Sequence, residues 1–197
     1  MVTPLLFTAL VAGVAVQRLL EVRRSAQNER RLRERGAREH APRHFRVMQL
    51  VHGSWLAASV LEVWLLEPPF RPWLALGAAV VFGIGQALRL AAVRALGERW
   101  SVRILTLPGE PAVATGIYRH LRHPNYLGVI LELVALPLVH GAVYTALVFS
   151  AANAALLWFR IREEERALAL DSDYPAHFAA RPRFLPRGVV FRSRGSS

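Results

Sequence analysis

The sequence predicts an all-α integral membrane protein, and three observations support this fold class. Just over half of the 197 residues are apolar, although the formal net charge is +11. The charged and the apolar residues separate into blocks along the chain, whereas a soluble domain of this length would scatter its charges over its surface. Several of the apolar blocks approach or reach the roughly 20 residues that an α-helix needs to cross a bilayer.

Three apolar stretches are each predicted to form one membrane span. They are Val2 to Leu20, Val47 to Leu66, and Trp73 to about Leu96. The first stretch lacks the basic n-region and the small-residue cleavage site of a secretory signal, so it is counted as a span.

The fourth apolar region, Leu127 to Phe159, is predicted to be a helical hairpin. It is interrupted by Pro137 and by His140 and Gly141. At a rise of about 1.5 Å per residue, it is long enough for two helices joined by a tight turn, the first of them short. The chain is therefore predicted to contain about five transmembrane helices.

The positions of the arginines predict the orientation of these helices. All 25 basic residues are arginine; ten lie between Arg18 and Arg46, six between Arg89 and Arg122, and eight between Arg160 and Arg194. Arg71 alone lies between the second and third spans. By the positive-inside rule the three groups are cytoplasmic, whereas the N-terminus and the turns at Arg71 and His140 lie outside.

Composition also limits the domain organisation and the kinds of site. The chain contains no cysteine, which excludes disulfides, thiolate metal sites and a cysteine nucleophile. Its apolar blocks do not fit a nucleic-acid binder, despite the positive charge. There is no internal repeat, so residues 1–187 are predicted to form one membrane domain and residues 188–197 a disordered tail. The sequence does not indicate an oligomeric state.

The candidates for chemistry lie on the predicted cytoplasmic side, between the third and fourth helices. This loop contains Gly97, Gly109, Gly116 and three prolines, and its run from Val102 to Thr106 is predicted to be extended. Such a loop can wrap a ligand. The alternative is an interfacial loop whose arginines bind the headgroups of membrane lipids.

The loop ends in the stretch YRHLRHPNYLG, which is predicted to start a helix. Pro124 suits the first position of a helix. His123, Asn125 and Tyr126 would then converge at the positive N-terminal end of the fourth helix, where a carboxylate or a phosphate binds favourably.

A second group of charges, in WFRIREEERAL, lies at the predicted cytoplasmic end of the fifth helix. On a helix, Arg160 and Glu164 share a face with Glu163, whereas Glu165 and Arg166 point elsewhere. Taken alone, the pattern fits a solvated face with a surface ion pair. Beside the positive end of the fourth helix, Glu164 would help to hold a zwitterionic ligand with an amine, a carboxylate or a sulfonium.

These motifs resemble those of the isoprenylcysteine carboxyl methyltransferase family of integral membrane S-adenosylmethionine enzymes. The resemblance lies in GIYRHLRHPNYLG, in RIREEERAL, and in the closing segments YPAHF and RPRFLP, so it covers residues 97–187. The N-terminal part, with RLLEVRRSAQNERRLRERGAREH, resembles the bacterial branch, including enzymes that O-methylate alkylpyrones. The resemblance implies a bacterial inner-membrane protein with a cytoplasmic active site.

The resemblance also implies roles for individual residues. S-adenosylmethionine is expected to be held by Arg103, Glu110, Pro111, Ala112, Val113, Tyr118, His123, Pro124, Asn125, Tyr126 and Glu164, while Arg160 faces the acceptor. The acceptor is expected to enter from the bilayer and to carry a carboxylate, enol or phenol on a long apolar tail, as in a prenylcysteine analogue or an alkylpyrone.

Methyl transfer to oxygen is an in-line displacement that needs alignment and exclusion of water, and no metal is expected. Arg160 can orient an acceptor that is already anionic, whereas a phenol would have to lose a proton to His123 or Glu132. Glu132 lies inside a predicted span and is therefore a functional candidate. The alternative is a hydrogen bond to Asn153 or Gln86.

Two further polar residues lie inside predicted spans. His52 and Arg89 either line a tunnel for the acceptor or are a helix-packing histidine and a snorkelling arginine, and the second interpretation is favoured. Two other function classes stay open. An RHPNYLG-like stretch also occurs in NADPH-dependent membrane sterol reductases, and a lipid-binding membrane scaffold would also explain the arginines.

Overall fold

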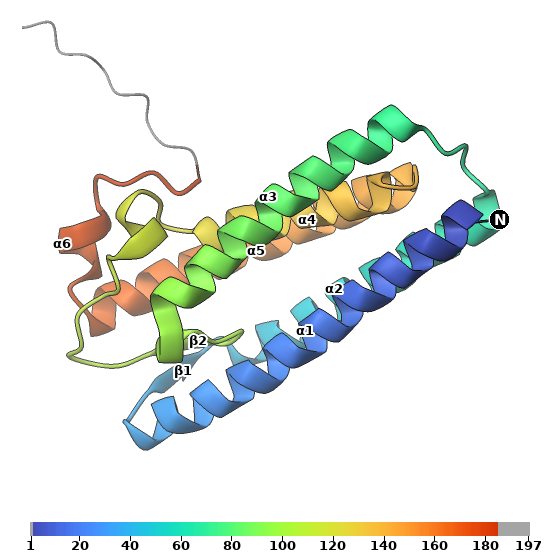
Figure 1. Ribbon diagram of the computed structural model, residues 1–197. Coiled ribbons are helices and arrows are strands. Elements are labelled where there is room, and N and C mark those ends of the chain that lie inside the picture. Colours follow the sequence, from blue (N-terminus) through green and yellow to red (C-terminus); the bar gives the residue numbers. More distant parts are fainter. Residues whose placement is uncertain (1, 185–197) are drawn as a thin grey trace, which may run out of the picture.

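The computed structural model describes residues 2–184, and in this part of the chain five long helices run along one common direction (Figure 1). They are α1 (Val2–Glu34), α2 (Pro42–Leu66), α3 (Pro72–Leu96), α4 (Pro124–Leu138) and α5 (Val143–Asp171). The helical hairpin predicted from the sequence corresponds to α4 and α5.

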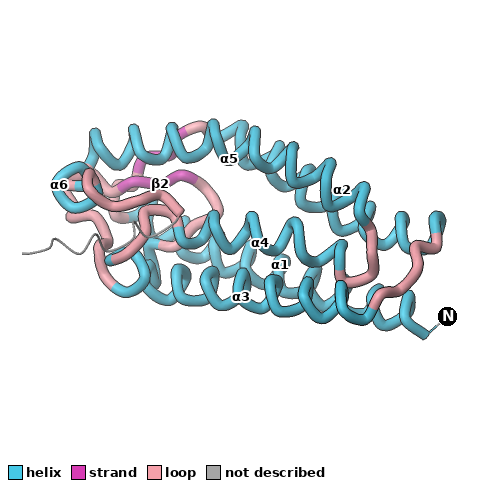
Figure 2. The backbone as a smooth tube through the Cα atoms, turned by 90° about the horizontal axis from the view of Figure 1, so that it is seen from above, coloured by secondary structure: helices cyan, strands magenta, loops and turns pink. Residues whose placement is uncertain are grey.

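The short elements gather at one end of the bundle, opposite the N-terminus (Figures 1 and 2). They are β1 (Arg38–His40), β2 (Ile104–Thr106), the 3-10 turns η1 (Gly97–Arg99) and η2 (Gly116–Arg119), and α6 (Tyr174–Phe178). The two strands pair antiparallel, with Arg38 opposite Thr106 and His40 opposite Ile104. We call this end of the bundle the loop end.

Three helices in the described part of the chain are long and apolar enough to cross a membrane: Thr3–Glu34, Pro72–Arg99 and Val143–Asp171. The helix α4 is apolar but shorter. The helix α2 is long, but Gln49, His52 and Glu62 make it more polar. Large apolar side chains such as Leu6, Leu65 and Trp73 stay exposed on the bundle, as expected where lipid replaces water.

The helices begin where the sequence supplies a suitable first residue or a partner for the free N–H groups. Proline is the first residue of α2, α3 and α4. At this position its fixed φ suits a helix, and its missing N–H removes no hydrogen bond within the helix. The helix α5 is capped by a side chain from α2 instead. The Glu62 carboxylate accepts hydrogen bonds from the N–H groups of Tyr144 (3.1 Å) and Thr145 (2.6 Å).

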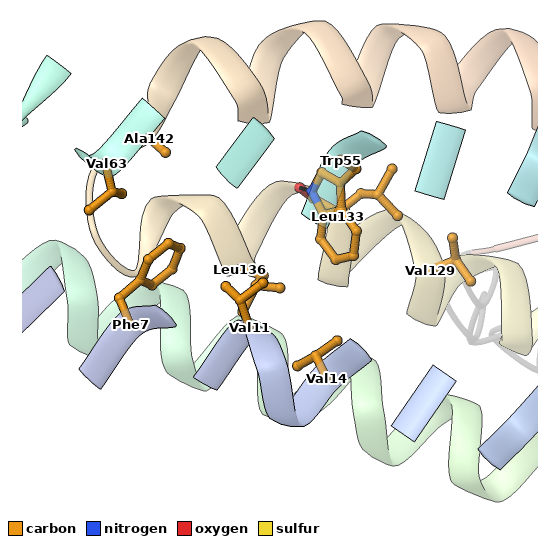
Figure 3. Packing of buried hydrophobic residues seen from close by; sticks show 9 residues of the cluster. All are labelled: Phe7, Val11, Val14, Trp55, Val63, Val129, Leu133, Leu136 and Ala142. Carbon is orange, nitrogen blue, oxygen red and sulfur yellow. Dashed lines mark hydrogen bonds between the residues drawn. The ribbon is translucent and has the colours of Figure 1, made fainter. Parts of the chain in front are cut away.

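An apolar core joins α1, α2 and α4 (Figure 3). It includes Phe7, Val11, Val14, Trp55, Val63, Val129, Leu133, Leu136 and Ala142. Pro137 has no N–H to bond the carbonyl of Leu133, four residues earlier in α4. The indole N–H of Trp55 bonds that carbonyl from α2 at 3.2 Å, so the proline also creates a contact between helices.

The closest helix contact, between α3 and α4, depends on two glycines. A Cβ atom at Gly85 would lie 2.9 Å from the carbonyl oxygen of Gly128, and one at Gly128 would lie 2.6 Å from Cγ of Arg89. Small residues let two helix backbones approach in this way. The contact also brings Arg89 of α3 beside Glu132 of α4, where Nε and Oε1 lie 3.4 Å apart.

Two details differ from the sequence prediction. The first helix does not end near Leu20 but continues to Glu34, because its polar second half packs under the loop end instead of forming a separate loop. The Val102 to Thr106 run is extended only at Ile104–Thr106. The tail predicted for residues 188–197 lies outside the described residues.

Replacing Gly85 with alanine should destabilise the bundle by about 1 to 3 kcal/mol, because the new Cβ overpacks the contact with Gly128. Gly83→Ala is the control, since no atom lies within 4 Å of a Cβ at that position in the same helix. Thermal unfolding in detergent measures both effects. Equal changes in the two variants would show that the contact does not limit stability.

The orientation predicted from the arginines can be tested with single cysteines, because the natural chain has none. Glu34, Arg71 and His120 have exposed side chains suited to labelling. A membrane-impermeant maleimide added to intact cells should label a cysteine at position 71 only. Labelling at position 120 from outside would contradict a cytoplasmic loop end.

Candidate functional site

Two adjoining cavities lie at the loop end of the bundle. The smaller has a volume of about 130 Å³ and lies among the loop before α4, the end of α5, and α6. The larger has a volume of about 500 Å³ and extends between the long helices. Five polar side chains line both cavities: Ser101, Arg103, Tyr118, His123 and Glu164. The two cavities therefore meet at these residues.

Most of the residues predicted to hold a cofactor come together around the smaller cavity. It is lined by Arg103, Glu110, Pro111, Ala112, Val113, Tyr118, His123 and Glu164. Three residues of the predicted set lie elsewhere. Asn125 and Tyr126 line the larger cavity, and Pro124 is fully buried at the start of α4 and lines neither.

His123 is held in place by a hydrogen bond that the helix pattern did not predict. Its Nε2 atom lies 3.0 Å from Oε1 of Glu165, and Arg183 donates two hydrogen bonds to the same carboxylate at 3.0 and 2.6 Å. Glu165 lines neither cavity, as its place on the other face of the helix predicts, but its contact with His123 was not predicted. Arg183 folds back onto α5 from the C-terminal segment, a contact that the periodicity of one helix does not show.

The same C-terminal segment closes the start of α4. The N–H groups of Arg122 and His123 donate to the carbonyl oxygens of Pro182 (3.0 Å) and Arg183 (3.1 Å). The Arg122 guanidinium donates to the carbonyl oxygen of Arg181 at 2.6 Å. These bonds satisfy polar backbone groups beside the helix start and fix the direction of His123.

Tyr126 connects the two charged residues that were predicted to share one face of α5. Its hydroxyl donates to the Glu164 carboxylate and accepts a hydrogen bond from Nε of Arg160 at 2.7 Å. Arg160, only 5% exposed, also donates from Nη2 to the carbonyl oxygen of Val102 at 2.7 Å. Arg160 lines only the larger cavity, whereas Glu164 lines both.

The segment from Glu110 to Val113 is fixed from both of its sides. The Glu110 carboxylate binds Arg35 at 2.6 Å and also binds Arg99, and the hydrogen bond from Arg35, with the charge of Arg99, lowers the Glu110 pKa. Asp173 accepts the N–H of Ala112 at 2.6 Å, and this bond lowers the Asp173 pKa. Both carboxylates therefore stay ionised and hold the wall of the smaller cavity.

Two tyrosines contribute hydroxyl groups to the wall of the smaller cavity. Burial raises the pKa of Tyr118 and of Tyr174, so both hydroxyls remain protonated at neutral pH. The Tyr174 hydroxyl is buried and has no hydrogen-bond partner. Phe178 stacks on Tyr174, with the ring centroids 4.5 Å apart, and both line the smaller cavity. No role was predicted for either residue, although both belong to the YPAHF segment.

Glu132 lines the larger cavity but does not have the partners expected from the sequence. It binds Arg18 at 2.5 Å and lies beside Arg89 at 3.4 Å. The expected hydrogen bond to Asn153 or Gln86 is therefore wrong, since Gln86 pairs with Gln17 at 2.8 Å. Partners on α1 were not predicted because α1 and α4 are far apart in the sequence.

The structure does not support the interpretation of Arg89 and His52 that was favoured from the sequence. Arg89 is 8% exposed and binds Glu21, so it is not an arginine that snorkels to the membrane interface. His52 lines the larger cavity, and its Nε2 atom has no hydrogen-bond partner. Arg18, Glu21, His44 and Gln49 also belong to the polar part of this wall and were not predicted. Arg18 had been interpreted only as a marker of orientation.

The arrangement provides two compartments of different chemistry. The smaller has carboxylates, arginines, a histidine and tyrosine hydroxyls at the loop end, which suits a polar ligand that carries several charges. The larger has mostly apolar walls with Arg160 and His123 where the two meet, which suits an apolar molecule with a polar head. Two ligands bound in them would meet at Glu164, Tyr118 and His123.

The chain is similar to several known proteins. The sequence model of the isoprenylcysteine carboxyl methyltransferase (ICMT) family matches residues 75–170. The chain is 37% identical over 164 residues to the uncharacterized protein YpbQ of Bacillus subtilis (strain 168), covering 83% of this chain and 96% of that protein. It is 31% identical over 147 residues to an uncharacterized protein of Haemophilus influenzae, covering 74% of this chain and 84% of that protein.

The fold is similar to a solved structure of the eukaryotic intramembrane Ras methyltransferase ICMT, determined without a monobody. The TM-score is 0.54 at 19% sequence identity, and the match covers 78% of this chain and 54% of that chain. The chain thus spans about half the length of the solved protein. At this identity the likeness establishes a shared fold.

Proposed function

The chain belongs to the isoprenylcysteine carboxyl methyltransferase family of membrane methyltransferases, and we propose that it methylates an oxygen of a lipophilic acceptor with S-adenosylmethionine as cofactor. The observation that carries this proposal is the pair of cavities that meet at Glu164, Tyr118 and His123. A methyl transfer needs its two reactants end to end, with the acceptor oxygen in line with the bond that breaks.

The smaller cavity has groups that match S-adenosylmethionine. Glu164 offers a carboxylate for a positive group, and the buried, unpartnered hydroxyl of Tyr174 offers a donor for a polar one. Arg103 and His123 can bind a carboxylate. When bound, the cofactor supplies a methyl group on a sulfonium, which is a good leaving group. The protein has to hold it, align it and exclude water.

Arg160 is the residue proposed to orient the acceptor. Its Nε atom is bonded to Tyr126 and its Nη2 atom to the Val102 carbonyl, so the guanidinium is held rigidly in the wall of the larger cavity. An anionic oxygen placed beside it needs no base, since a carboxylate or an acidic enol is already ionised at neutral pH. Both acceptor classes with a long apolar tail are therefore compatible with this site.

Catalysis by one of the two bases considered from the sequence is less favoured than methyl transfer to an acceptor that is already anionic. His123 is engaged with Glu165 through Nε2. Glu132 is paired with Arg18 and lies six residues beyond Tyr126, about 9 Å deeper along α4. Neither group is free beside the junction of the two cavities.

The routes by which the two ligands enter, and the side of the membrane that the site faces, follow from the same proposal. The apolar acceptor enters the larger cavity from the bilayer, and the water-soluble cofactor enters the smaller one from the loop end. With the orientation predicted from the arginines, this end faces the cytoplasm of a bacterial cell, where S-adenosylmethionine is made.

Ligand-dependent thermal stability tests the proposed function. S-adenosylhomocysteine, the product form of the cofactor, should raise the unfolding temperature of the detergent-purified protein, because a ligand that binds only the folded state stabilises it. NADPH should cause no shift. A shift with NADPH alone would instead indicate a reductase, and no shift with either would favour a lipid-binding scaffold.

The division of roles between Glu164 and Arg160 can be measured with three variants. Glu164→Gln should weaken S-adenosylhomocysteine binding about 10- to 150-fold, the loss expected for one charge-assisted contact of about 1.5 to 3 kcal/mol. Arg160→Ala should leave this affinity nearly unchanged and lower methyl transfer to a lipid acceptor by a similar factor.

Glu163→Gln is the matched control, because Glu163 pairs with Arg166 and lines neither cavity. Calorimetry gives the affinities and initial rates give the transfer. If Arg160→Ala lost cofactor binding as severely as Glu164→Gln, Arg160 would belong to the cofactor site and its proposed role would be wrong.

A further inference from the structure

The larger cavity has a second polar region that the proposed function does not use. Four charged side chains line it away from Arg160: Arg18 and Glu21 from α1, Arg89 from α3, and Glu132 from α4. The neighbouring walls are apolar, with residues such as Leu133 and Leu157. A cavity for a hydrocarbon tail alone has no need of charges, since burying them is costly.

The contacts within this group leave one buried donor and one buried acceptor, which form an ion pair with each other, free of hydrogen bonds. Arg18 binds Glu21 at 2.6 Å and Glu132 at 2.5 Å, and Arg89 binds Glu21 through Nη2. Nε of Arg89 and Oε1 of Glu132 are both buried and have no hydrogen-bond partner. They lie 3.4 Å apart, and the Glu132 side chain is only 2% exposed. A buried charged group with an unused bonding position is unfavourable unless a ligand occupies it.

The position of this free pair is fixed by the fold. Gly85 and Gly128 hold α3 against α4 so closely that Arg89 and Glu132 have to lie side by side. Glu132 comes six residues after Tyr126 on α4, which corresponds to about 9 Å along the helix. The free pair therefore lies about 9 Å deeper in the cavity than the Tyr126–Arg160 contact.

A hydroxyl group matches this pair better than other polar groups. It can accept the N–H of Arg89 and donate its own proton to Glu132. A carbonyl would leave Oε1 of Glu132 without a hydrogen bond, and an ammonium would leave Nε of Arg89 without one. A carboxylate would be repelled by Glu132 and Glu21.

We propose that Arg89 and Glu132 form a subsite for a hydroxyl group on the acceptor, about 9 Å from the oxygen that is methylated. This inference rests on the proposed function for the identity of the bound molecule. It narrows the acceptor to lipophilic molecules with two polar positions: the reacting oxygen beside Arg160 and a hydroxyl deeper in the cavity. Molecules with a plain hydrocarbon tail are predicted to be poorer ligands.

Three lipids with an ionised carboxylate test the subsite in the wild-type protein. They are 3-pentadecylbenzoic acid, the same lipid with a hydroxyl on the fourth tail carbon, and the same lipid with a hydroxyl on the twelfth. In an extended tail, the fourth carbon places the two oxygens about 9 Å apart, as along α4. Calorimetry in lipid nanodiscs with S-adenosylhomocysteine should show that the second lipid binds roughly 10-fold or more tightly than the other two.

A charge-balanced variant then assigns the preference to the subsite. Arg89→Met with Glu132→Leu removes one positive and one negative charge and leaves the Arg18–Glu21 pair intact. Replacing both partners of a buried pair is better tolerated than removing one. This double variant should bind all three lipids about equally. Gln17→Leu with Gln86→Leu is the control, because this pair joins α1 to α3 outside the cavity wall and its loss should keep the preference.

The outcomes separate the subsite from the proposed function. Equal binding of the three lipids by the wild-type protein would overturn the subsite, whether or not the variants fold. A preference that survives in the Arg89 and Glu132 double variant would also overturn it. Methyl transfer to the carboxylate oxygen is measured separately. A binding preference without any transfer would contradict the proposed function and leave the subsite standing.

Discussion

Every charge inside the helical bundle has to be paired, and the arrangement of the bundle interior depends on this constraint. Arg160 finds its partner in the hydroxyl of Tyr126, which in turn bonds Glu164. Deeper in the bundle, Arg18 and Glu132 form a second paired group. In an apolar surrounding, each unpaired charge would cost several kcal/mol, so the positions of the helices and of the charges are fixed together. The close α3–α4 contact at Gly85 and Gly128 serves this pairing, because it brings Arg89 beside Glu132.

The parts of the fold that depend on local composition could be predicted from the sequence. The apolar runs gave the helices α2 to α5 to within a few residues, except that α5 continues beyond Phe159 to Asp171, and the interruption at Pro137 and Gly141 marked the hairpin. Local composition did not predict the full length of α1, because its second half is polar and yet helical as far as Glu34. That half is stabilised by contacts with the loop end, for example the bond from Asn28 to the Trp100 carbonyl oxygen at 2.8 Å, and these contacts leave no periodic pattern in the chain.

The residues of the candidate site also divide into those whose contacts could be predicted from the sequence and those whose contacts could not. Residues within one motif were brought together as expected: Arg160 and Glu164, one turn apart on α5, share Tyr126 as a partner. Residues whose partners come from distant segments were misjudged. Glu165 depends on Arg183 from the C-terminal segment, and Glu132 depends on Arg18 from the first helix. A single sequence shows which residue types are available, but the choice between partners is made by the packing of helices that are far apart in the chain.

The backbone bonds from Arg122 and His123 to Pro182 and Arg183 have a consequence for the order of assembly. The start of α4 leaves the ribosome about sixty residues before the segment that closes it. During synthesis the helices can already be inserted into the bilayer while His123 still lacks its final support. The start of α4 therefore gains its final support only after residues 182 and 183 have been made, and a chain truncated before them would lack these bonds beside His123.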